Sequence, residues 1–238
     1  MEIYTERICA QRFEQGRLVD FEDVVLVEKS LKLFLNEDLL LCFTCTGKDI
    51  KELIVGRLFC DEVIQSISDI LSIVIDNEAE AVHVTTSVKK NTLPQTIESP
   101  SNAILEPDYP LVISAFDRFQ ELSTLFKDTG AVHSAALLDI EYNFCYFYED
   151  MGRHNAVDKV IGKALLDGFP ISRSMLMTSS RMPLELIKKA GRAGIPAVMS
   201  ISAPTAQSIN FAKENNITLI GMFRNKRINI YNQRSSQL

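Results

Sequence analysis

The chain has 238 residues, of which 46% are hydrophobic and 24% charged, and its formal net charge is −6. This composition is typical of a globular protein with one large domain or two unequal domains, and the negative charge argues against long nucleic acid as a partner. The apolar runs are too short to cross a bilayer and no leader segment opens the chain, so we expect neither secretion nor membrane insertion.

The cysteines form an odd, scattered set, which argues against a disulfide framework. They are Cys9, Cys42, Cys45, Cys60 and Cys145. A set of this kind fits a reducing compartment, so we expect a cytoplasmic protein.

Residues 1–86 are predicted to form a small strand-rich domain with one helix. Residues 31–36 and 39–46 have the pattern of a hairpin around Asn36-Glu37-Asp38. A stripe of apolar residues from Ile50 to Phe59 then predicts a helix. Two further strands are expected at residues 70–75 and 81–86.

Residues 87–110 contain four prolines and many Ser, Thr and Asn residues, without a sustained apolar period. We interpret them as a linker loop between two domains, because long loops inside compact proteins are uncommon and tend to be functional. An amphipathic helix is predicted to follow at residues 111–126, with Gly130 as its stop signal.

Residues 111–238 are predicted to form an α/β domain. A hairpin is expected at residues 136–140 and 144–148, and strands and helices alternate after it. The predicted helices are 155–166, 183–190 and 205–214, and the predicted strands are 175–178, 196–201, 218–223 and 227–231. Alternation of this kind requires a largely parallel sheet covered by helices.

Polar residues collect where these strands meet the following helices. Ligands of such sheets bind beyond the carboxyl ends of the strands, where hydroxyls, backbone amides and guanidinium groups can hold a phosphate or pyrophosphate. The candidate binding residues are Gly152, Arg153, His154, Asn155, Ser179, Ser180, Arg181, Ser202, Thr205, Phe223, Arg224, Asn225, Lys226 and Arg227.

Structural roles are the alternative for several of these residues. Ser202 and Thr205 are good helix N-caps. Arg153 and Arg181 could be surface charges or partners of nearby carboxylates, and His154 could satisfy a local carbonyl. The expected meeting of these residues on one edge of one sheet favours a binding site.

Several stretches at these junctions resemble the formate dehydrogenase accessory sulfurtransferase family (FdhD). The most specific is Gly-Arg-His-Asn-Ala-Val-Asp-Lys at residues 152–159, and the others are residues 129–135, 179–181, 202–205, 219–224 and 229–231. The resemblance covers the chain from Leu111 onward and continues more weakly through the N-terminal half.

The resemblance implies a cytidine deaminase-like α/β domain that handles the bis-molybdopterin guanine dinucleotide form of the molybdenum cofactor, for which GDP is a simple analogue. Members of the family receive sulfur from a cysteine desulfurase as a persulfide and pass it to this cofactor before its insertion into formate dehydrogenase. The resemblance also implies a homodimer. It adds two residues to the candidates: His133, which lies in the matching stretch 129–135, and Met222, because residues 222–227 match the family's cofactor-binding stretch.

One departure concerns the family's Cys-Gly-x-Cys-Gly pair, whose first cysteine bears the persulfide. The corresponding residues 85–94 of this chain contain no cysteine, and no cysteine occurs anywhere between Cys60 and Cys145. Cys42 and Cys45 are expected on opposite faces of a strand. The carboxylates beside Cys60 should raise its pKa, and Cys145 is expected in the core.

Two functions therefore remain open: an accessory sulfurtransferase, and a non-catalytic chaperone that binds the cofactor but moves no sulfur. A zinc deaminase is excluded, because that chemistry needs His-x-Glu and a Cys-x-x-Cys pair downstream of it. His133 is followed by Ser134 and Ala135, and no such cysteine pair follows.

Overall fold

The structure is a computed structural model that describes residues 4–87 and 107–234. Its largest element is a six-stranded sheet in the order β12-β11-β10-β9-β7-β8. The strands are β7 (His133–Leu138), β8 (Phe144–Asp150), β9 (Met175–Thr178), β10 (Ala197–Ser200), β11 (Thr218–Arg224) and β12 (Arg227–Asn232). Strands β9, β10 and β11 are mutually parallel, whereas β7 and β12 run antiparallel to their neighbours.

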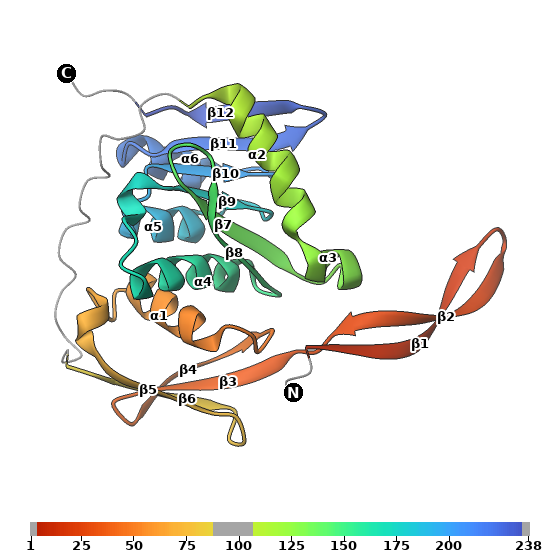
Figure 1. Ribbon diagram of the computed structural model, residues 1–238, viewed down its shortest axis with the longest axis horizontal. Helices are drawn as coiled ribbons and strands as arrows, with labels where there is room; N and C mark the ends of the chain where they lie inside the picture. The colour runs from red at the N-terminus through yellow and green to blue at the C-terminus, as the bar shows by residue number, and fades with distance from the viewer. Residues whose placement is uncertain (1–3, 88–106, 235–238) are drawn as a thin grey trace.

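Helices cover both faces of this sheet, so the predicted α/β class is confirmed (Figure 1). Helix α2 (Tyr109–Leu122) packs on one face through Val112, Phe116 and Phe119. The other face is covered by α4 (Arg153–Leu166), α5 (Leu184–Arg192) and α6 (Ala206–Glu214), with the short 3-10 helix η2 (Ile171–Arg173) beside them. The two faces hold separate apolar clusters.

The single helix predicted at residues 111–126 is wrong, because the chain breaks at Ser123 into α2 and α3 (Thr124–Thr129). The carboxylate of Glu149 accepts hydrogen bonds from the amides of Leu125 and Phe126 and from the Ser123 hydroxyl. These bonds satisfy the first amides of a new helix, and helix N-termini favour negative charge.

A second, four-stranded sheet in the order β4-β3-β6-β5 forms the N-terminal part. It comprises β3 (Lys29–Leu35), β4 (Asp38–Cys45), β5 (Ile70–Asp76) and β6 (Ala81–Thr86), with the 3-10 helix η1 (Ile67–Asp69) before β5. Helix α1 (Ile50–Cys60) covers one face through Leu53, Ile54 and Leu58. The four strands and the helix predicted from residue 31 onward are confirmed. Most of the predicted linker, residues 88–106, lies outside the described part of the chain.

A hairpin of β1 (Thr5–Glu14) and β2 (Arg17–Leu26) projects from the body as an arm (Figure 1). No individual strand is predicted from the sequence for these residues. Among residues 4–87 and 107–234, no helix combines the length and apolar character that a bilayer span requires.

Helices α1 and α4 join the two parts by an unusually close crossing. A methyl group added at Gly56 would come 1.8 Å from the backbone oxygen of Asp158, and one added at Gly162 would come 1.9 Å from that of Glu52. Both obstacles are backbone atoms, which cannot move aside as a flexible side chain could. Glycine is therefore required at both positions.

Gly162→Ala is expected to lower the free energy of unfolding by at least about 2 kcal/mol, because over-packing typically costs 1–3 kcal/mol and here the obstacle is backbone. Chemical denaturation of both proteins measures this change. The control is Gly191→Ala in α5, where the added methyl meets only side chains, the nearest at 3.3 Å. Equal stability of Gly162→Ala and the wild type would refute the close crossing.

Candidate functional site

The predicted strand ends lie along one edge of the six-stranded sheet. His133 at the start of β7 pairs with Asp150 at the end of β8. Thr178 at the end of β9 lies opposite Ala135 of β7 and opposite Ser200 at the end of β10. We call this edge the carboxyl rim and define it as residues 131–134, 149–154, 178–182, 200–205 and 222–227.

Hydrogen bonds connect the turns of the carboxyl rim from neighbour to neighbour. The Ser179 amide donates to the Ser134 oxygen at 3.0 Å, and the Met222 amide donates to the Ser202 oxygen at 3.0 Å. The Arg224 guanidinium donates to the Ile201 oxygen at 2.8 Å. Turns far apart in the sequence thus form one continuous surface.

Positive charge gathers at the part of the rim around His133. Burial lowers the pKa of the half-buried His133, and the charges of Arg153 and Arg181 lower it further. The structural alternative, in which Arg153 pairs with a neighbouring carboxylate, does not hold. Glu149 accepts hydrogen bonds from the first amides of α3, and Asp150 forms an ion pair with Lys159 at 2.8 Å. Arg153 Nε is buried and has no hydrogen-bond partner among the described residues.

A pocket of about 610 Å³ opens beside His133, between the rim and helices α2 and α3. This volume lies within the range of small-molecule sites. Its wall combines aromatic and aliphatic groups with hydroxyls and one imidazole, contributed among others by Phe119, Ser123, Phe126, His133, Ser179 and Ile201. Phe126, which the sequence analysis did not select, is the largest half-exposed apolar side chain of this wall. The only sequence signal for it is its place at the end of the predicted apolar stripe, shortly before Gly130.

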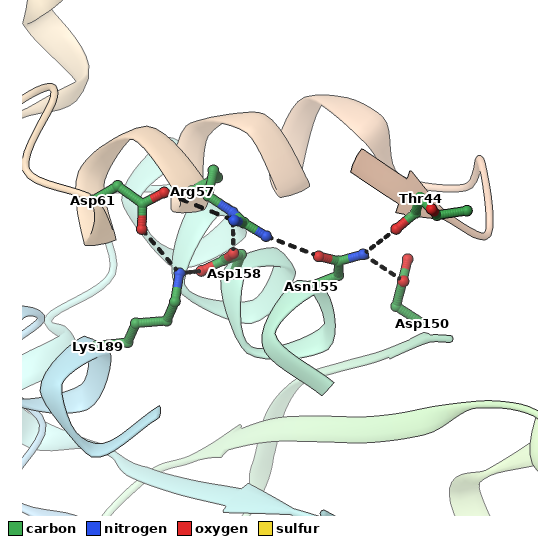
Figure 2. A network of polar contacts seen from close by, with 7 residues as sticks. All are labelled: Thr44, Arg57, Asp61, Asp150, Asn155, Asp158 and Lys189. Atoms are coloured by element: carbon green, nitrogen blue, oxygen red, sulfur yellow. Dashed lines mark hydrogen bonds and ion pairs between the residues drawn. The ribbon is translucent and has the colours of Figure 1, made fainter. Parts of the chain in front are cut away.

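Asn155 requires a correction, because its side chain lies in the interface between the two parts of the molecule and not on the rim (Figure 2). Its amide nitrogen donates to the Thr44 oxygen at 2.8 Å and to Asp150 at 2.9 Å, and its oxygen accepts a bond from Arg57 at 3.0 Å. The side chain is 5% exposed and fully occupied by these partners.

Asp158, one helical turn further along α4, is the centre of the same network (Figure 2). Its carboxylate is completely buried and binds Arg57 of α1 at 2.9 Å and Lys189 of α5 at 2.6 Å. Asp61 at the end of α1 lies near both cations. The buried carboxylate of Asp158 therefore joins three helices through its two cationic partners, of which Lys189 is nearly buried and Arg57 partly exposed.

The side chains of three further candidates, Ser180, Thr205 and Phe223, form contacts within the protein itself. Ser180 is 1% exposed and donates to the Arg181 oxygen at 2.9 Å. Thr205 caps α6 reciprocally with Ser208, which confirms its N-cap interpretation, whereas Ser202 is not an N-cap. Phe223 is 7% exposed and stacks on Phe116.

The 222–227 stretch is the end of the β11–β12 hairpin. Asn225 and Lys226 have φ values of 49° and 61°, which is typical of a two-residue type I′ turn, and Met222 lies at an irregularity of the ladder. Lys226 forms an ion pair with Asp117 of α2. Arg224 and Arg227 remain exposed.

The positions of Cys42, Cys45 and Cys60 agree with the sequence predictions, whereas that of Cys145 does not. Cys42 is exposed and Cys45 is buried, so they do lie on opposite faces of β4. The pKa of Cys60 is raised well above its usual value, mainly by burial and then by Asp158. The prediction for Cys145 is wrong, since it is only partly buried and belongs to none of the core clusters. Residues 88–94 of the stretch that corresponds to the family's cysteine pair lie outside the described residues.

The chain is thus an α/β protein with a rim of arginines, hydroxyls and helix starts at its strand ends. It belongs to the FdhD/NarQ family, whose model matches residues 26–237.

Relatives match over nearly their whole length. The sulfur carrier protein FdhD of Bacillus subtilis is 32% identical, with 92% of each chain covered. That of Saccharolobus solfataricus is 34% identical, with 94% of this chain and 96% of the relative covered. A crystal structure of a candidate formate dehydrogenase accessory protein from Desulfotalea psychrophila superimposes with a TM-score of 0.84 at 25% identity, covering 97% of each chain.

His154 supplies a pH-dependent contribution to stability. Burial and then the charges of Lys189, Arg153 and Arg57 lower its pKa to about 4, whereas an unfolded histidine titrates near about 6.5. The unfolded state therefore binds the extra proton first, so stability should fall as the pH drops from about 6.5 towards about 4. This contribution to stability is fully present above that window.

We expect His154→Gln to flatten this pH-dependence in denaturant titrations at pH 5 and pH 7.5. His83→Gln, at an exposed position on β6, is the matched control. An unchanged slope between the two pH values in His154→Gln would contradict the assignment.

Proposed function

We propose that this protein is an accessory protein in formate dehydrogenase maturation and that its carboxyl rim binds the bis-molybdopterin guanine dinucleotide cofactor as a client. The gathering of Arg153 and Arg181 around His133 is the observation that carries the proposal. We further propose that it acts in the cytoplasm, with formate dehydrogenase and a cysteine desulfurase as its protein partners.

The cofactor's pyrophosphates match the chemistry of the rim. Guanidinium groups bind phosphate oxygens through paired, charge-assisted hydrogen bonds. Helix α4 begins at the rim, and its N-cap residue is Gly152, which offers no side-chain oxygen to the first amides. A phosphate can accept from amides at such a helix start. The buried Arg153 Nε, which has no hydrogen-bond partner within residues 4–87 and 107–234, supports the same interpretation.

The pocket beside His133 suits the ring systems of the cofactor. Its wall offers the faces of Phe119 and Phe126 for packing, and Ser179 and His133 for hydrogen bonds. Because burial lowers the pKa of His133, its imidazole is neutral at physiological pH. One ring nitrogen can then donate a hydrogen bond and the other can accept one. A guanine or pterin ring needs such a mixture of partners.

The distribution of cysteines favours the second candidate function, a cofactor-binding chaperone without sulfur transfer. The persulfide of a sulfur carrier needs an accessible thiolate. Burial raises the pKa of Cys45 and Cys60, while the exposed Cys9 and Cys42 lie on β1 and β4 and not on the rim. Sulfur transfer by the family's route would therefore require a different carrier.

Arg153→Ala and Arg181→Ala are each expected to weaken GDP binding about tenfold or more, since a hydrogen bond to a charged group contributes about 1.5–3 kcal/mol. Isothermal titration calorimetry measures the affinity, with AMP as the competing nucleotide of lower affinity. Lys213→Ala, an exposed lysine on α6 away from the rim, is the control. Unchanged GDP affinity in both arginine variants would remove the rim from the binding site.

Incubation with a cysteine desulfurase and cysteine distinguishes the two candidate functions. We expect no persulfide on this protein by intact-mass analysis, and a persulfide on the Bacillus subtilis relative treated in parallel as the positive control. A persulfide on any cysteine of this chain would contradict the chaperone function, and Cys9→Ser and Cys42→Ser would then locate it.

A further inference from the structure

Helix α3 forms part of the wall of the pocket beside His133, but no apolar core holds it in place. Its Phe126 lines that pocket and is 50% exposed. None of the six residues of α3 is buried. A helix of this length is not stable by itself, because the cost of its first turn is not recovered by the few bonds that follow. Contacts at its ends must therefore fix its position.

The carboxylate of Glu149, at the end of β8, fixes the start of α3. One of its oxygens accepts hydrogen bonds from the Ser123 hydroxyl at 2.6 Å and the Phe126 amide at 3.1 Å. The other accepts from the Leu125 amide at 3.1 Å. Ser123 occupies the N-cap position but makes no cap bond with its own side chain. Glu149 therefore caps α3 in its place, with its negative charge at the positive end of the helix.

The same hydrogen bonds connect α3 to the carboxyl rim. Ser123 donates its single hydroxyl proton to Glu149, so the hydroxyl of Ser134 donates to Ser123, at 2.8 Å. The Ser134 amide in turn donates to the Ser179 hydroxyl at 2.9 Å. All three serines line the pocket. The cap on α3 is thus continuous with β7 and with the turn that follows β9.

The other contacts of α3 lead away from the rim. Lys127 donates to the Glu121 oxygen of α2 at 2.7 Å, and the Gly130 amide closes the helix on the Phe126 oxygen at 2.8 Å. Strand β2 of the arm runs beside the helix. Within residues 4–87 and 107–234, the hydrogen bonds that join α3 to the six-stranded sheet are therefore those of Glu149.

We propose that Glu149 is a positioning residue for the ligand of the rim and that it acts through Phe126. By capping α3, Glu149 holds the Phe126 ring at the pocket, where the ring packs on the guanine or pterin ring of the ligand. Arg153 and Arg181 bind the phosphates, so the two sets of residues contact different parts of one ligand. Both oxygens of Glu149 are occupied by α3 and its N-cap, so Glu149 itself makes no ligand contact. This inference rests on the proposed function.

Calorimetric titration with GDP and with pyrophosphate tests the route through Phe126. Glu149→Ala and Phe126→Ala are each expected to weaken GDP binding about tenfold, because each removes the ring contact and the apolar area that it covers. The double variant should bind no more weakly than either single variant, since both changes remove the same contact. Pyrophosphate has no ring and should bind all three variants as it binds the wild type. Glu214→Ala, at the exposed end of α6, is the control.

Three outcomes of these titrations would overturn the proposal. The first is unchanged GDP affinity in Glu149→Ala when the wild type binds GDP. The second is a double variant whose loss is the product of the two single losses, which would mean that Glu149 acts independently of Phe126. The third is an equal loss of pyrophosphate and GDP affinity, which would mean that Glu149 supports the phosphate site and not the ring.

Amide hydrogen exchange without ligand tests whether Glu149 holds α3, and it needs no nucleotide. Glu149→Gln keeps the size of the side chain but removes one acceptor oxygen, so the Gly130 amide should exchange at least about threefold faster. That amide bonds within α3 and not to Glu149, so it reports on the whole helix. The Val112 amide at the start of α2 should not change.

Unchanged exchange at Gly130 would overturn the positioning role of Glu149. Equal acceleration at Gly130 and Val112 would do so as well, because it would indicate general destabilisation. A wild type that binds no GDP would instead refute the proposed function, and the exchange result would still decide whether Glu149 holds α3.

Discussion

The close approach of α1 and α4 is the constraint on which the rest of the molecule depends. With glycine at 56 and 162 the two backbones touch, and the buried Asp158 then reaches both Arg57 and Lys189. The most specific sequence stretch of the chain thus has two roles along one helix. Its first residues, Gly152 to His154, face the carboxyl rim, and its later residues hold the two parts of the molecule together. The start of α4 contributes to the carboxyl rim. Its position is fixed because the same helix is held against α1 and α5 by the glycine crossing and the ion pairs of Asp158.

Much of the fold could be predicted from the sequence, because each buried strand is a short apolar run and each helix an apolar stripe. The break at Ser123 could not, since no glycine or proline marks it. It depends on Glu149, which lies 26 residues away from Ser123 and caps the new helix. The arm was not predicted for a different reason: residues 5–26 mix charged and apolar side chains on one face, so their alternation is weak.

For the candidate site, the sequence predicted the common edge but not the direction of every side chain. Topology alone brings the ends of β8, β9 and β10 together, so the positions of Arg153 and Ser179 followed from the pattern. Asn155 and Thr205 have the same polar character and lie at the same kind of junction. Asn155 nevertheless donates to the Thr44 carbonyl in a buried network, and Thr205 accepts from the Ser208 amide as a helix cap. A polar residue at a helix start can thus bond the protein itself as readily as a ligand.

A crystal structure of the protein with GDP tests the central claim most directly, because it locates the ligand without reference to activity. The account predicts that the diphosphate lies between Arg153 and Arg181 at the start of α4, with the guanine ring in the pocket beside His133. GDP bound away from the carboxyl rim, with these two arginines making no contact to it, would contradict the account.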